Sequence, residues 1–169
     1  MNLMLAEELA KHLMKQWNVG EEWKFIWSNG KRQLGCAAET RKRLTGEIVK
    51  RQLRLSRHLV RHNEEEEVRD VILHEIAHIL AGLEHGHDAV WKEMARKVGA
   101  RPERCADTSK VKVVEPKYIV VCTLCETTIR KSHRRVRLER RYCRTCGTPS
   151  VGKLEMRWNP KRGNVREDV

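Results

Sequence analysis

The sequence has no run of apolar residues approaching the ~18 that a membrane-spanning helix needs. Its opening residues, MNLMLAEELAKHLMKQW, are interrupted by Glu7, Glu8 and Lys11, so they lack the continuous apolar segment of a secretory signal peptide. We also find no internal repeat. These absences argue against a membrane or secreted protein, and we expect a cytoplasmic protein with no membrane partner.

The composition is that of a globular protein, with 40% apolar and 34% charged residues. The chain of 169 residues is long enough for one modest core and a small second module. Residues 1–104 carry 19 Lys and Arg against 16 Asp and Glu, a net +3, whereas residues 105–169 carry 16 against 7, a net +9. This concentration of positive charge favours a polyanionic partner, most often nucleic acid, with a merely soluble basic surface as the alternative.

Apolar periodicity predicts a first helix from residue 3 to about residue 17. Trp23, Phe25 and Trp27 then alternate as in a strand, and Asn29-Gly30 predicts a two-residue hairpin. Residues 46–56 alternate as an outer strand would. We therefore expect a short antiparallel sheet.

Asn63 and the four glutamates after it predict the N-cap and first turn of a helix over residues 64–82, since acidic residues favour that end of a helix. On this helix Val68, Ile72 and Ile76 fall on a core-facing stripe opposite the HEIAH segment. A further helix is expected to follow, ending near Gly99.

The HEIAH segment has the HExxH pattern of zinc peptidases. His74 and His78 lie one helical turn apart and can bind one zinc ion, while Glu75 is placed to activate a zinc-bound water as general base. Asp70, one turn earlier, either orients the His74 ring or is an exposed carboxylate.

A catalytic zinc site needs a third protein ligand. The metzincin pattern requires Gly at position 81 and His at position 84, but this chain has Ala81 and Glu84. His85 and His87 remain as candidates.

A second metal site is predicted by the cysteines of the C-terminal part, which form two CxxC pairs separated by 17 residues. Cys122, Cys125, Cys143 and Cys146 have the spacing of a structural four-cysteine zinc ribbon, bringing the expected zinc ions to two. Cys36 and Cys105 show no metal-ligand pattern, and Cys36 is expected to be a small buried residue.

The segment between the CxxC pairs is strongly basic and alternates like a strand. Tyr118, Tyr142 and Trp158 could stack on exposed bases. Alternatively, the ribbon only braces the catalytic domain and the aromatic residues form its core. The predicted nucleic-acid contacts are Arg130, Lys131, Arg134, Arg135, Arg137, Arg140 and Arg141.

HEIAH followed by a short loop and HGHDAVWKEMA resembles the SprT-like metallopeptidases, relatives of the Spartan proteases. The resemblance implies that the third zinc ligand is His87, that Trp91 packs beneath the site, and that His85 is a loop residue or a transition-state donor. It extends upstream to the Leu-Ser step in RLSRHL and downstream to the ribbon. We hypothesise that residues 46–56 form a strand edge that binds an extended substrate.

The resemblance implies an α+β fold, with a small zincin-type metallopeptidase domain at 1–108, a β zinc ribbon at 112–158 and a flexible basic tail at 159–169. It further implies an endopeptidase that cleaves proteins bound or crosslinked to DNA. We expect a monomer, with single-stranded DNA as the favoured nucleic acid. Two other hypotheses are an ImmA/IrrE-like peptidase that cuts a repressor, and a zinc-ribbon nucleic-acid binder with a vestigial peptidase site.

Overall fold

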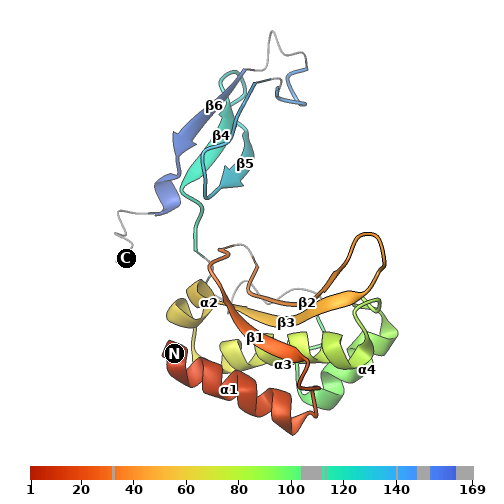
Figure 1. Cartoon of the computed structure of the whole chain (residues 1–169). Helices are drawn as coiled ribbons and strands as arrows, with labels where there is room; N and C mark the ends of the chain where they lie inside the picture. The colour runs from red at the N-terminus through yellow and green to blue at the C-terminus, as the bar shows by residue number, and fades with distance from the viewer. Residues whose placement is uncertain (32, 104–111, 113, 140, 148–152, 163–169) are drawn as a thin grey trace. The chain divides into compact units, whose positions relative to one another are not determined.

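The computed structural model describes residues 1–31, 33–103, 112, 114–139, 141–147 and 153–162 (Figure 1). The chain forms two compact units, Met1–Val113 and Val114–Val169, and each is described by itself. Within the described residues, no helix is both long enough and apolar enough to cross a membrane. The elements of the first unit are α1 Leu3–Gln16, β1 Trp23–Ser28, β2 Gly35–Arg41, β3 Ile48–Ser56, α2 Arg57–His62, α3 Glu65–Ala81 and α4 Ala89–Val98.

Helix α3 forms the centre of the core of the first unit, confirming the helix predicted over residues 64–82. Val68, Ile72 and Ile76 are fully buried, as the stripe opposite HEIAH predicts. Figure 1 shows α1 and α3 against the same face of the sheet, and α4 packs on α3. Burial on this scale makes α3 a rigid element on which to position chemical groups.

The sheet is mixed, not antiparallel, with the strand order β1-β3-β2. β1 is parallel to β3, and β2 is antiparallel to it. Residues 46–56 therefore contain the central strand, so their prediction as an outer strand is wrong. The order has a packing reason, because it places Phe25 and Trp27 beside Leu53 and Leu55, and pairs of large side chains on neighbouring strands stabilise a sheet.

The Asn29-Gly30 hairpin prediction is also wrong, because β1 and β2 do not pair with each other. The backbone N–H of Gly30 instead donates to Ser28 Oγ at 3.0 Å, and the Gly30 carbonyl accepts from Ser56 Oγ at 2.8 Å. These bonds hold the loop across the end of β3, so that the chain reaches the far side of β3 before β2 begins. Tertiary pairing has overridden a local turn preference.

Helix α2 follows β3 without a loop and is absent from the sequence prediction. Ser56 ends the strand and caps the helix, since its Oγ accepts from the backbone N–H groups of His58 at 3.2 Å and Leu59 at 3.3 Å. The Leu-Ser step is thus a strand end joined to a helix start.

Asn63 is not the N-cap of α3 as predicted, but the C-cap of α2. Its side chain is buried, donates from Nδ2 to the carbonyls of Leu59 and Lys112 at 2.9 Å, and accepts from Lys112 N at 2.6 Å. Glu64 takes the N-cap position of α3 without a side-chain hydrogen bond. The buried bonds to Lys112 satisfy Asn63 better than a cap would, which explains the difference.

The second unit contains a three-stranded antiparallel sheet with the order β5-β4-β6, made of β4 Tyr118–Cys122, β5 Thr128–Ser132 and β6 Leu154–Trp158. The strand predicted between the two cysteine pairs is wrong, because residues 133–139 and 141–143 form no strand. Val136 and Leu138 are only half-buried there. The third strand lies instead after the second cysteine pair, in a segment where no strand was predicted.

Asn159, which the sequence analysis assigns to the flexible tail, is buried within the second unit. Its backbone N–H donates to Lys117 O at 2.9 Å, and its Nδ2 donates to Pro116 O at 2.9 Å. A 3-10 turn, η1, follows over Pro160–Arg162. The remainder of the predicted tail, 163–169, lies outside the described residues.

Candidate metal centres

Helix α3 presents His74, Glu75 and His78 on the side opposite its buried stripe. His74 and His78 are one turn apart, and their ring centroids lie 5.1 Å from each other. This is the arrangement that the i, i+4 spacing of the HEIAH segment predicts.

His87, from the loop that precedes α4, completes a cluster of three imidazoles. Its Nε2 lies 3.2 Å from Nε2 of His74 and 3.2 Å from Nε2 of His78. Zinc–nitrogen bonds of about 2.0–2.1 Å in tetrahedral geometry would hold such nitrogens about 3.3 Å apart. The donor set and its spacing therefore fit a zinc ion, and His74, His78 and His87 form a candidate metal site.

Both helical histidines are poised to be neutral, which is the form that binds a metal. Burial is the main cause that lowers the pKa of His74 to about 4, with smaller contributions from the neighbouring His78 and His87. Burial and His87 likewise lower the pKa of His78 to about 4. An unprotonated nitrogen is the ligand that zinc requires.

His85 lies outside the three-histidine cluster. Its Nδ1 is 2.9 Å from Asp88 Oδ2, and Asp88 caps α4 by accepting from Trp91 N at 3.0 Å. The backbone carbonyl of His85 accepts a hydrogen bond from the ring of His78, and this bond acts to raise the pKa of His78. Such a bond fixes the orientation of an imidazole whose other nitrogen faces a metal.

These placements predict different zinc contents for two alanine variants. His87→Ala is expected to lower bound zinc from two equivalents to one, because it removes a ligand of the three-histidine cluster. His85→Ala is expected to keep both equivalents, since the side chain of His85 pairs with Asp88. Elemental analysis of the purified variants measures this, and equal zinc loss in both would contradict the assignment.

Trp91 packs against all three histidine rings of the cluster, as the family resemblance implies. It is fully buried, and its ring centroid lies 4.7 Å from that of His74, 5.1 Å from that of His78 and 4.5 Å from that of His87. Packing against Trp91 limits the rotation of all three imidazole rings. This lowers the entropy lost when they converge on one ion.

The side chain of Glu75 is held by a backbone group of β2. Its Oε2 accepts a 2.7 Å hydrogen bond from the backbone N–H of Ala37. Burial raises the pKa of Glu75 to about 7, although the Ala37 bond acts in the opposite direction. A buried carboxylate oriented by one backbone donor suits a general base.

Gly35 makes this approach of β2 to α3 possible. A Cβ at this position would lie 2.8 Å from Glu75 Cγ and 2.9 Å from Val71 Cγ1, closer than carbon atoms can pack. Gly35 and Ala37 thus position Glu75, and sequence reasoning missed both. A glycine within a predicted strand is the one signal that could have indicated a close approach there.

Asp70 neither orients His74 nor stands alone as an exposed carboxylate. Its Oδ1 accepts from Arg101 N at 2.9 Å, and its Oδ2 accepts from Arg101 Nε at 2.8 Å. Arg101 also binds Glu67. This pairing ties the chain beyond α4 to the first half of α3, and both earlier interpretations of Asp70 are corrected by it.

The four cysteines of the second unit come together as their spacing predicts. Sγ of Cys122 lies 3.7 Å from Sγ of Cys146, and Sγ of Cys125 lies 3.8 Å from Sγ of Cys143. Zinc–sulfur bonds of about 2.3 Å in a tetrahedron would hold the sulfurs about 3.8 Å apart. The cluster fits a second zinc ion and a zinc ribbon.

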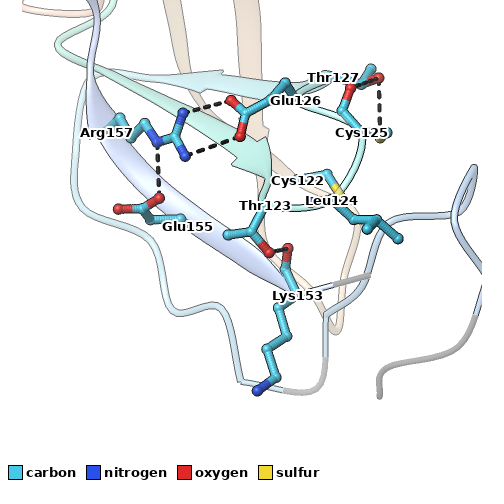
Figure 2. A network of polar contacts seen from close by, with 9 residues as sticks. All are labelled: Cys122, Thr123, Leu124, Cys125, Glu126, Thr127, Lys153, Glu155 and Arg157. Atoms are coloured by element: carbon cyan, nitrogen blue, oxygen red, sulfur yellow. Dashed lines mark hydrogen bonds and ion pairs between the residues drawn. The ribbon is translucent and has the colours of Figure 1, made fainter. Parts of the chain in front are cut away.

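Figure 2 shows the polar contacts around the first cysteine pair. The Thr127 side chain and backbone lower the pKa of Cys125 to about 6, which favours the metal-binding thiolate. Arg157 of β6 binds Glu126 at 2.6 and 3.3 Å and Glu155 at 2.8 Å. The turn that carries Cys125 is thereby tied to the sheet.

Six of the seven predicted nucleic-acid contacts lie in described segments, and all six are exposed. Arg130 and Lys131 lie on β5, with Lys131 Nζ 3.5 Å from Glu115 Oε2. The exposed arginines described between β5 and the second cysteine pair are Arg134, Arg135, Arg137 and Arg141. Arg140 lies outside the described residues.

The aromatic residues of the second unit are partly accessible. Trp158 is 53% exposed and Tyr142 is 44% exposed, whereas Tyr118 is half-buried and packs edge-on against Trp158 with centroids 5.8 Å apart. At least two rings therefore present a surface to solvent.

Cys36 belongs to no metal cluster found among the described residues. Cys36 is half-buried on β2, and burial together with the nearby Glu75 raises the pKa of its thiol. Cys105 lies outside the described residues.

Comparison with known proteins gives a family match over the first unit. A model of the SprT-like family matches residues 6–111. Proteins called Protein SprT from Pectobacterium carotovorum subsp. carotovorum and Pectobacterium atrosepticum are each 32% identical over 104 residues, or 57% of this chain. The match covers 61% of each relative, less than two thirds of its length. No solved structure matches the chain.

Proposed function

Since the chain belongs to the SprT-like family, we propose that it is a zinc-dependent endopeptidase acting on proteins bound or crosslinked to DNA. The observation that carries the peptidase proposal is the convergence of three histidine nitrogens beside a buried glutamate. A structural metal site would need a fourth protein ligand, and no Cys, Asp or Glu of the described chain joins this cluster.

The residues of the site have separate roles in the proposed reaction. His74, His78 and His87 would hold a zinc ion, which supplies a Lewis acid that acidifies water and polarises a peptide carbonyl. Glu75 takes a proton from the attacking water and returns it to the leaving amine. The Ala37 N–H fixes one oxygen of Glu75 during both transfers.

The substrate is proposed to lie along β2, not along residues 46–56. β3 pairs on both sides, so its edges are occupied, whereas β2 is an outer strand beside Glu75. The Ala37 N–H points away from β3, so the backbone groups of Glu39, two residues on, point the same way. An extended peptide can pair with such an edge without sequence preference.

A hollow lies beside the sheet at the end of α3. It has a volume of about 590 Å³, and it is lined by residues of all three strands and of the end of α3, among them Trp23, Glu39, Arg41, Arg51, Ile79, Gly82 and Leu83. A hollow of this size holds several side chains of a bound peptide. It supports cleavage within a chain in preference to trimming from an end.

The second unit is proposed to bring the peptidase to nucleic acid. Its exposed arginines offer phosphate contacts, and Trp158 and Tyr142 offer faces on which unpaired bases can stack. These features favour single-stranded DNA as the ligand of this unit.

Cleavage of a DNA-binding protein with and without single-stranded DNA tests this proposal. We expect single-stranded DNA to accelerate cleavage at low salt, and the acceleration to fade as salt displaces the phosphate contacts. Unfolded casein serves as the control substrate, because it does not bind DNA. Equal rates with and without DNA would remove the DNA part of the proposal, and no cleavage by the zinc-loaded protein would favour a binding module.

A further inference from the structure

The sheet of the first unit has a second face that the site does not use. The large side chains of β1 and β3, such as Trp23, Leu53 and Leu55, point into the core. Because side chains alternate along a strand, the residues between them point to the opposite face. Figure 1 shows α1 and α3 on the core side, and no described helix covers the other side.

This outer face carries positive charge and no negative charge. Lys24 of β1 and Lys50 and Arg54 of β3 point outward, whereas no Asp or Glu lies at an outward position of the three strands. The carboxylate of Glu39 on β2 is at an inward position and pairs with Arg51 at 2.9 Å. The face is thus a local cationic surface on a unit with little net charge.

The three cations form a triangle on the sheet. Lys50 and Arg54 are four residues apart on one strand, about 13 Å. Lys24 pairs in register with Gln52, midway between them and one strand away. Gln52 Oε1 accepts from Arg54 Nε and Nη2 at 3.1 and 2.6 Å, which holds the guanidinium close to the sheet. On the other side, Ala38 of β2 presents only a methyl group.

We propose that this outer face binds the phosphate backbone of duplex DNA. Cations on a surface without acidic neighbours complement regularly spaced phosphates. No aromatic residue lies at an outward position of the three strands, so the face offers no ring on which an unpaired base could stack. Duplex DNA needs no such ring, because its bases stack on one another.

A protein partner fits the face less well. Its large apolar side chains among the described strand residues are Ile26, 39% exposed, and the half-buried Ile48 at the start of β3. Protein interfaces have an apolar centre from which charged residues are depleted, and this face has the reverse composition. The proposal concerns binding alone and does not depend on the peptidase activity.

The test is DNA binding by the full chain and by the triple variant Lys24→Gln, Lys50→Gln, Arg54→Gln. The probes are a fluorescent 20-bp duplex and one of its strands, titrated over a range of salt concentrations without protein substrate. Each phosphate contact contributes about 0.9 to the slope of log K against log salt, so we expect the variant's slope for the duplex to be shallower by about 2 to 3. Duplex affinity near physiological salt is expected to fall at least about tenfold.

The matched control is Lys92→Gln, Arg96→Gln, Lys97→Gln, which removes the same charge from exposed positions of α4. Equal losses in the two triple variants, or no loss in either, would overturn the proposal, and so would a loss confined to the single strand. Thr40→Lys adds a cation to the same face at an exposed position. It should steepen the duplex slope by about 0.9, and an unchanged slope would contradict the proposal even if the first variant failed to fold.

Discussion

Replacing Glu75 by Gln is expected to lower kcat/KM for protein cleavage by about 10²- to 10⁴-fold, the usual contribution of a general base. The amide keeps the shape of the side chain, and its oxygen can still accept the hydrogen bond from Ala37 N that Glu75 Oε2 accepts. The variant should therefore fold and retain both zinc ions, so that the loss reports on proton transfer. Steady-state cleavage of a fluorogenic unfolded protein measures it.

Glu66→Gln is the matched control, because it makes the same chemical change at an exposed position of α3. Its kcat/KM should equal that of the wild type. If Glu75→Gln retained more than about a tenth of wild-type kcat/KM with both zinc ions bound, Glu75 would not be the base.

Replacing Cys143 by Ser is expected to abolish the fold of the second unit and to lower bound zinc from two equivalents to one. The buried apolar residues described in this unit are only Val120, Val121, Cys122 and Cys143. So small a core cannot fold alone, and binding of structural zinc contributes about 10 to 16 kcal/mol in comparable small domains. The first unit has its own core and should keep its structure.

Cys36→Ser provides the control, since Cys36 belongs to neither metal cluster. This variant should retain both zinc equivalents and all amide resonances of the second unit in a ¹H–¹⁵N spectrum. A Cys143→Ser protein that kept dispersed resonances for Tyr118–Cys122 and Leu154–Trp158 would show that the sheet folds without the metal.

The metal-ligand clusters were predictable because their geometry is encoded locally. One helical turn separates His74 from His78, and a CxxC turn brings two sulfurs together whatever the rest of the chain does. His87 was open to the alternative of His85 on residue reasoning alone. The family resemblance favoured His87, and the structure places that residue in the cluster.

The strand order was not predictable from local pattern. Asn29-Gly30 has strong hairpin chemistry, yet the chain passes over the end of β3 because burial of Phe25 and Trp27 beside Leu53 and Leu55 outweighs a turn preference. Alternation shows which residues share a face, but not which strand lies beside which.

The hydrogen bond that orients Glu75 was likewise not predictable, because its donor is the backbone N–H of Ala37, 38 residues earlier in the chain. A backbone donor has no residue type that a sequence can reveal. A glycine at position 35 weakly indicated a close approach of another element. Only the contact of β2 with α3 shows why a side chain is excluded there.

The most direct test of the account is proteolysis in H₂¹⁸O, with mass analysis of the fragments. We predict internal cleavage in which each new C-terminal carboxyl gains one ¹⁸O. Removal of the metal with a chelator should abolish this cleavage, and addition of zinc should restore it. Glu75→Gln should produce these fragments at least about a hundredfold more slowly. Absence of internal fragments with wild-type protein holding two zinc equivalents would contradict the assignment of His74, His78, His87 and Glu75 as a peptidase site.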